Sequence, residues 1–115
     1  MDCQFIHING QLVKRFMFRD YLGYICYIDC KDGKVFCIGR KDDFEQCTSS
    51  IHPRRFREMI RSMCEDSWFN DYVVFLEAIS KDEQLFKIAK EEIGEALKNK
   101  LNQVQRMTEA LTKVY

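Results

Sequence analysis

This chain has a single proline, no net charge and no long apolar run. Of its 115 residues only Pro53 is a proline, and basic and acidic residues number 18 each, so the formal net charge is zero. A neutral chain has no overall attraction for nucleic-acid phosphates. No apolar run approaches the roughly 18 residues of a membrane span, and the start, Met1-Asp2-Cys3, lacks the basic region of a signal peptide. We therefore expect a cytoplasmic protein with no membrane contact.

What the chain does contain is enough apolar material for one core. Hydrophobic residues make up 46% of the sequence, which at this length supports one ordinary domain without disulfide or metal staples. We expect a single α+β domain over residues 1–115. Its N-terminal half would form antiparallel β-hairpins that pack against helices of the C-terminal half.

A first β-hairpin is predicted near the N-terminus. Apolar and polar residues alternate over residues 3–18 and are interrupted at Asn9-Gly10, a dipeptide that strongly favours a two-residue hairpin turn. This turn sets the register of the two strands. It places His7 opposite Leu12.

A second hairpin is predicted over residues 23–40, because Asp32-Gly33 is a turn signal of the same kind. In a regular hairpin Ile28 then pairs with Cys37. Both faces of this hairpin are largely apolar, so both need to be covered. The two predicted faces are Cys26, Ile28, Cys30, Val35 and Cys37 on one side, and Ile25, Tyr27, Phe36 and Ile38 on the other.

The second half of the chain predicts helices. Pro53 fits the first turn of a helix over residues 52–64. Apolar residues recur every three or four positions over 81–113, which predicts one long C-terminal helix. Ser80 as its N-cap and Glu83 three positions later would form a capping box.

Two stretches lie between these elements. Residues 41–50 are polar and predict a loop. Residues 68–79 fit a helical stripe, but the β-branched and aromatic run at 72–76 also fits a short buried strand. The capping signal that follows directly favours the strand.

The cysteines are candidates for metal binding or catalysis. Tight Cys-x2–4-Cys knuckles, usually two of them, are typical of structural zinc sites, whereas Cys26-x3-Cys30 lies within a predicted strand and has no second pair. Cys47 is followed by His52 and several arginines, which could activate a thiol, but no nucleophile signature accompanies it. We expect free thiols, no metal, no cofactor and no enzymatic activity. The six cysteines are Cys3, Cys26, Cys30, Cys37, Cys47 and Cys64.

The most basic stretch is a candidate binding site on the predicted helix 52–64. Arg54, Arg57 and Arg61 fall on one helical face, which suits a phosphate or an acidic partner. The alternative is a solvated helix face, which the neutral total charge favours. The full candidate set is His52, Arg54, Arg55, Arg57 and Arg61.

The C-terminal helix carries a narrow apolar seam. Leu97, Leu101, Val104, Leu111 and Val114 recur at spacings close to 3.5 residues, and such a seam suits a partner helix better than a globular core. We expect contact with another protein or with a second copy as a homodimer. The predicted interaction surface is Tyr27, Phe36, Leu101, Val104 and Leu111.

Part of the chain, over roughly residues 22–98, resembles the GIY-YIG nuclease domain. The residues that carry the resemblance are Gly23-Tyr24-Ile25-Cys26-Tyr27-Ile28-Asp29, Asp32-Gly33-Lys34-Val35-Phe36-Cys37-Ile38-Gly39 and Asp71-Tyr72-Val73-Val74-Phe75-Leu76-Glu77. The family cleaves nucleic acid with tyrosines of its two name motifs, a helical arginine and a metal-binding glutamate. Ile25 and Cys37 stand at the two tyrosine positions, Cys47 lies near the arginine position, and Glu91 or Glu92 lies near the glutamate position. The resemblance thus implies a copy that has lost cleavage.

These observations lead to three hypotheses. The first is a small non-catalytic binding or regulatory protein that acts through macromolecular contacts, mainly with protein. The second is a nucleic-acid-binding protein, with or without residual cleavage of the GIY-YIG kind. The third, a small-molecule pocket over the face that carries Tyr27 and Phe36, rests on aromatic content alone.

The departures from the motif predict that the protein does not cut nucleic acid. With magnesium or manganese supplied, incubation with DNA or RNA should leave the substrate intact on a gel, because Ile25 and Cys37 lack the hydroxyl groups of the family's tyrosines. Metal-dependent nicking that disappears in the Glu91→Gln or Glu92→Gln variant would contradict this.

Overall fold

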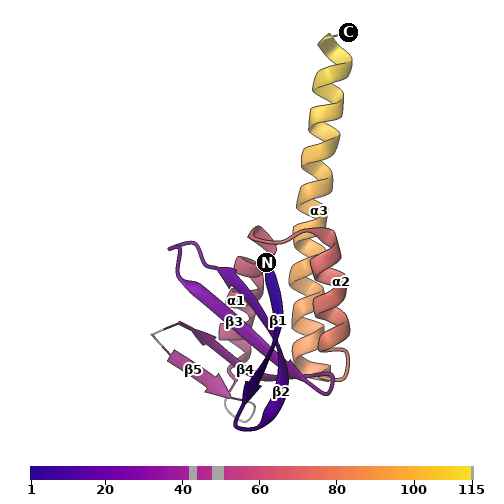
Figure 1. Cartoon of the computed structure of the whole chain (residues 1–115). Coiled ribbons are helices and arrows are strands. Elements are labelled where there is room, and N and C mark those ends of the chain that lie inside the picture. Colours follow the sequence, from indigo (N-terminus) through magenta and orange to yellow (C-terminus); the bar gives the residue numbers. More distant parts are fainter. Residues whose placement is uncertain (42–43, 48–50, 115) are drawn as a thin grey trace.

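A five-stranded antiparallel sheet and three helices make up the computed structural model, which describes residues 1–41, 44–47 and 51–114 (Figure 1). The strands lie side by side in chain order. They are β1 (Asp2–Ile8), β2 (Gln11–Arg19), β3 (Ile25–Lys31), β4 (Lys34–Arg40) and β5 (Phe44–Cys47). The helices are α1 (Pro53–Glu65), α2 (Phe69–Ala78) and α3 (Glu83–Val114). The predicted α+β class, with hairpins first and a long C-terminal helix, is confirmed.

Both hairpin turns form where they were predicted. Asn9, Gly10, Asp32 and Gly33 all have positive φ angles, of 49°, 78°, 53° and 81°. A type I′ turn needs positive φ at both central residues, and Asn-Gly and Asp-Gly meet this need at low cost. β1 and β2 pair in the predicted register throughout.

The second hairpin departs from its predicted register because β4 contains a bulge. The register shifts between Asp29 and Cys30, so that Phe36 is skipped and Asp29 pairs with Cys37. One extra residue reverses the face of everything beyond it. Ile38 therefore lies in the core, and Cys37 lies on the opposite face, which is the reverse of the predicted assignment.

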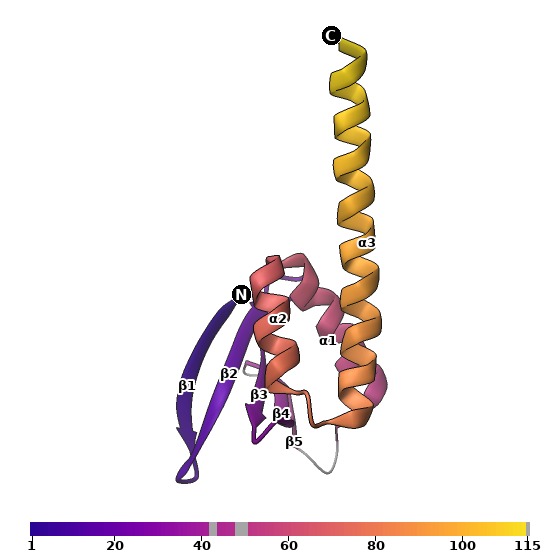
Figure 2. The ribbon, with the colours of Figure 1, turned by 90° about the vertical axis from the view of Figure 1, so that its right-hand side faces the viewer.

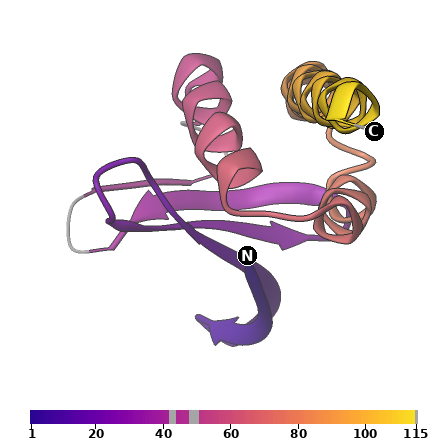
Figure 3. The ribbon, with the colours of Figure 1, turned by 90° about the horizontal axis from the view of Figure 1, so that it is seen from above.

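The helices cover one face of the sheet. Figure 2 shows the sheet and the helices as two layers with β1 farthest from α3, and Figure 3 shows α1 and α3 on the same side of the sheet. The Phe16 and Phe75 rings meet edge to face at 5.2 Å between centroids, and this contact joins β2 to α2. The largest wholly buried apolar side chains are Phe16, Phe56, Phe75, Ile28, Ile38, Met59, Ile60, Met63 and Ile79.

Residues 68–79 contain a helix, α2, so the predicted strand is wrong. Tyr72, Phe75 and Ile79 are buried at helical spacing, whereas Val73 and Val74 are exposed. Burial of the large side chains on one helical face outweighs the strand preference of the β-branched pair. The predicted loop at 41–50 also contains an element, the short strand β5.

The start of α3 is capped by a residue that the predicted capping box leaves out. The helix begins at Glu83, and the carboxylate of Asp82 accepts hydrogen bonds from the backbone N–H groups of Leu85 at 3.3 Å and of Val35 at 3.1 Å. Asp82 therefore takes the N-cap role predicted for Ser80. It also ties the helix start to β4.

The face of the sheet that points away from the helices carries an ion pair between a partly exposed arginine and a buried aspartate. Asp29 is 0% exposed and accepts two hydrogen bonds from Arg15, at 2.8 and 2.9 Å. The Arg15 guanidinium also lies 4.1 Å from the centroid of the Tyr27 ring. That ring covers Gly39 so closely that a Cβ there would collide with it. These contacts cover the central strands on the face of the sheet that the helices leave uncovered.

We expect the Asp29→Ala variant to lose about 3 kcal/mol of unfolding free energy, because it leaves the Arg15 guanidinium without its buried partner. Urea unfolding followed by circular dichroism measures the loss. The exposed Glu109→Ala variant is the control and should change little. A loss below about 1 kcal/mol for Asp29→Ala would show that the ion pair does not support the sheet.

Candidate functional site

The N-terminal part of α1 holds three of the five predicted basic residues. His52 is the N-cap, and its Nδ1 accepts a hydrogen bond from the backbone N–H of Arg54 at 3.2 Å. The Arg54 side chain is largely exposed and lies 4.0 Å from Glu58. Arg55 lies 3.6 Å from the same carboxylate. These residues share an acidic neighbour on their own helix.

The other two basic residues join α1 to α3. Arg57 donates to Glu92 at 2.8 Å and to Glu91 at 3.1 Å, and Arg61 donates to Glu92 at 2.9 Å. The hydrogen bonds from Arg61 and then Arg57 lower the pKa of the Glu92 carboxyl. Two of the three arginines predicted to meet a phosphate are therefore engaged with carboxylates of the same chain. The structure offers no observation that favours a phosphate site there.

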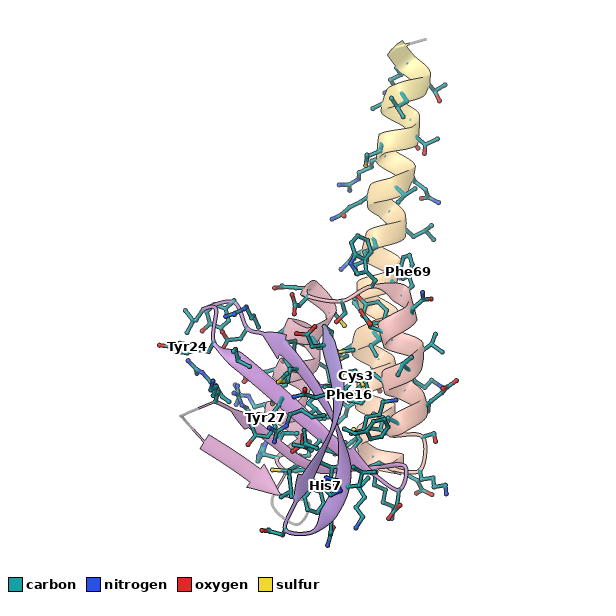
Figure 4. All side chains as sticks on the ribbon, in the orientation of Figure 1. Cys3, His7, Phe16, Tyr24, Tyr27 and Phe69 are labelled. Atoms are coloured by element: carbon teal, nitrogen blue, oxygen red, sulfur yellow. The ribbon has the colours of Figure 1, made fainter. Side chains whose placement is uncertain are left out.

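The predicted interaction surface falls into two separate parts. Tyr27 lies on the sheet, where its ring contacts the Arg15 guanidinium (Figure 4). Phe36 lies half-buried at the bulge of β4. Leu101, Val104 and Leu111 lie on the part of α3 that projects beyond the body. Only the second part offers a continuous exposed stripe.

α3 has two halves with different surroundings. Its first half belongs to the core, where Leu85, Ile88, Ala89 and Ile93 are buried. Residues 98–114 then project beyond the body by about 25 Å, at a rise of ~1.5 Å per residue (Figure 1). The large apolar side chains of this extension are between 57% and 66% exposed: Leu101, Val104, Met107 and Leu111.

Phe69, at the start of α2, lies beside the point where α3 leaves the body (Figure 4). It is 57% exposed, and its neighbour in the chain, the only tryptophan, Trp68, is the N-cap of α2 and is 79% exposed. Lys100 joins this region to α3, since its Nζ donates to the Tyr72 hydroxyl at 2.6 Å and lies 5.7 Å from the centroid of the Phe69 ring. Because residues 68–79 were predicted to form a strand, these two residues were not included in the predicted interaction surface. We call the following six side chains the apolar stripe: Trp68, Phe69, Leu101, Val104, Met107 and Leu111.

The described cysteines form no disulfide with one another, and burial raises the thiol pKa of two of them. Cys3, Cys26, Cys30, Cys37 and Cys64 are free thiols. Burial raises the pKa of the Cys64 thiol to about 11 and also raises that of Cys30, so neither is activated as a nucleophile. The side chain of Cys47 lies outside the described residues. Within the described ranges no cluster of His, Cys, Asp and Glu could hold a metal ion.

Comparison with known protein families, with curated proteins and with solved structures finds no match for this chain. The resemblance to the GIY-YIG nuclease domain therefore stays a prediction. Among the described residues no helix combines the length and the apolar character that crossing a membrane requires.

The Glu92 contacts predict a pH-dependent contribution to stability. Because the pKa of Glu92 is lower in the folded protein than its ordinary value of 4.5, its charged form stabilises the fold at pH 7. The Glu92→Gln variant should unfold at lower urea than the unchanged protein at pH 7. This difference should shrink as the pH falls below about 4.5 and vanish below the folded pKa.

Glu91→Gln is the matched control for this prediction. Glu91 is half exposed and makes one contact with Arg57, so its replacement should cost less at pH 7. A Glu92→Gln effect that stays constant from pH 7 to pH 3 would contradict an electrostatic origin.

Proposed function

We propose that this is a small non-catalytic binding protein that acts through protein–protein contacts, and that the extension of α3 pairs with the same segment of a second copy. The observation that carries the proposal is the apolar stripe. Four large apolar side chains of one helix project from the body at a nearly constant spacing, each more than half exposed. An unsupported helix is only marginally stable in water, so packing against a partner helix would stabilise this extension.

The spacing of the stripe suits a helical partner. Leu97, Leu101, Val104 and Leu111 occupy the a and d positions of a heptad repeat, with Thr108 at the remaining a position. A seam of this width is covered by one further helix and leaves the polar residues on the outside in water. Leu97 is half-buried against the core, so the seam continues directly from the body into the extension.

The side chains that flank the seam allow a second copy as the partner. The e and g positions beside the seam, which set partner choice in coiled coils, are Lys98, Lys100, Gln105, Met107 and Thr112 within residues 98–112. Two of the five are lysines and none is acidic, so repulsion between two copies can come only from Lys98 and Lys100. Three of the five are uncharged, and Lys100 is already engaged with Tyr72, so a second copy meets little repulsion.

The proposal places the protein in the cytoplasm. The five described cysteines are free, and a reducing compartment keeps thiols in that state. The exposed Cys3 would otherwise offer a site for disulfide exchange between copies. We extend the proposal to a regulatory role exercised through these contacts.

Charged substitutions in the stripe test this proposal. The Leu101→Glu, Val104→Glu double variant should remain folded by circular dichroism but raise the dimer dissociation constant at least about 100-fold in sedimentation equilibrium, because four charges would enter the seam. The Asn102→Glu, Ala110→Glu variant adds the same charge outside the seam and should dimerise normally.

A chain that ends at Lys100 gives an independent check. It keeps the contact between Lys100 and Tyr72, so it should fold and sediment as a monomer. If the full-length protein is itself a monomer at high concentration, self-association is wrong.

A further inference from the structure

We infer that the two α3 extensions pair antiparallel, so that the tip of each lies against Trp68 and Phe69 of the other copy. This inference rests on the proposed self-association. It adds the direction of the two helices and the part of each body that joins the interface. Three observations lead to it.

The first observation is the position of Thr108, which with Leu101 occupies the a positions of the extension, whereas Val104 and Leu111 occupy its d positions. A parallel pair places a against a, so that the two Thr108 side chains meet each other. An antiparallel pair instead places a against d, so that Thr108 meets Val104 and Leu101 meets Leu111 of the other copy. The apolar residues at the two ends of the extension then cover each other.

The second observation is Met107, which is 66% exposed although it lies beside the seam at a g position. In a parallel pair, g positions face e positions, and Met107 would meet the hydroxyl of Thr112. In an antiparallel pair, g faces g, and Met107 meets Met107 of the other copy close to the two-fold axis. Only the antiparallel pair covers this side chain with an apolar one.

The third observation is the position of the two aromatic residues. Lys100, which contacts the Phe69 ring, is also at a g position, so Phe69 flanks the seam on the same side as Met107. An antiparallel partner brings its last helical turns to this level of the body. A parallel partner carries its tip about 25 Å away from them. Antiparallel pairing therefore covers the whole apolar stripe.

Mixed disulfide formation between two variants distinguishes the two directions. Equal amounts of the Leu101→Cys and Leu111→Cys proteins are mixed, oxidised briefly with oxidised glutathione, and digested with trypsin. Cleavage after Lys100, Arg106 and Lys113 releases the peptides 101–106 and 107–113, and no native cysteine lies beyond Cys64. Every disulfide between these peptides therefore reports the α3 pairing.

We expect the crossed product, 101–106 joined to 107–113, to exceed both self-joined products at least about tenfold, because the Cα atoms of a disulfide lie within about 7 Å. Self-joined 101–106 and 107–113 in excess would overturn the antiparallel arrangement while leaving the proposed self-association intact. The absence of any joined peptide, together with monomeric sedimentation, would overturn both. The Asn102→Cys variant, which faces away from the seam, is the control for random collision.

The single tryptophan reports the contact with the body. Dilution of the unchanged protein through its dissociation range should shift Trp68 emission to longer wavelength as the partner's tip leaves it. The Leu101→Glu, Val104→Glu variant should show the longer wavelength at every concentration. If the crossed disulfide forms but Trp68 emission does not change with concentration, the tip does not reach Trp68, and that part of the inference is wrong.

Discussion

Glu92 accepts hydrogen bonds from two arginines of α1, and these contacts join α3 to α1 along the part of α3 that lies on the body. Ile93, the next residue, is buried in the core, and Lys100, two turns later, holds the helix against α2 through the Tyr72 hydroxyl. Asp82 fixes the start of the helix to β4. The first half of α3 is thus attached to the body near Asp82, Glu92 and Lys100. The second half extends into solvent and has no such contacts with the described part of the body.

Local signals in the sequence predict the turns and the α+β class, but not the bulge in β4. Asn9-Gly10 and Asp32-Gly33 act within a few residues, so their effect is visible in the sequence. The bulge at Phe36 depends on which side chains the opposite strand buries. Asp29 needs Arg15 as a partner on the uncovered face, and the shifted register also places Ile38 in the core. Which face each of these side chains occupies therefore depends on contacts between strands of the assembled sheet, and local sequence patterns do not display such contacts.

The candidate site was likewise predicted only where its residues follow a local pattern in the sequence. Leu101, Val104 and Leu111 follow from a heptad spacing within one helix, which the sequence displays directly. Phe69 was missed because the competing strand and helix patterns at 68–79 differ only in which neighbours bury them. The role of Arg57 and Arg61 depended on Glu92, 31 residues beyond Arg61 in the chain. Charge counts along the sequence do not disclose such a pairing.

α3 runs without a break from the hydrophobic core to its tip, and this continuity couples folding to assembly. Unfolding of the core would remove the anchor of the extension, so a dissociated and unfolded chain cannot retain the paired helix. By mass action, a partner that binds only the folded state adds to its stability in proportion to the logarithm of its own concentration. Under the proposed self-association, the abundance of this protein in a cell would set its thermal midpoint, and dilution alone would shorten its lifetime.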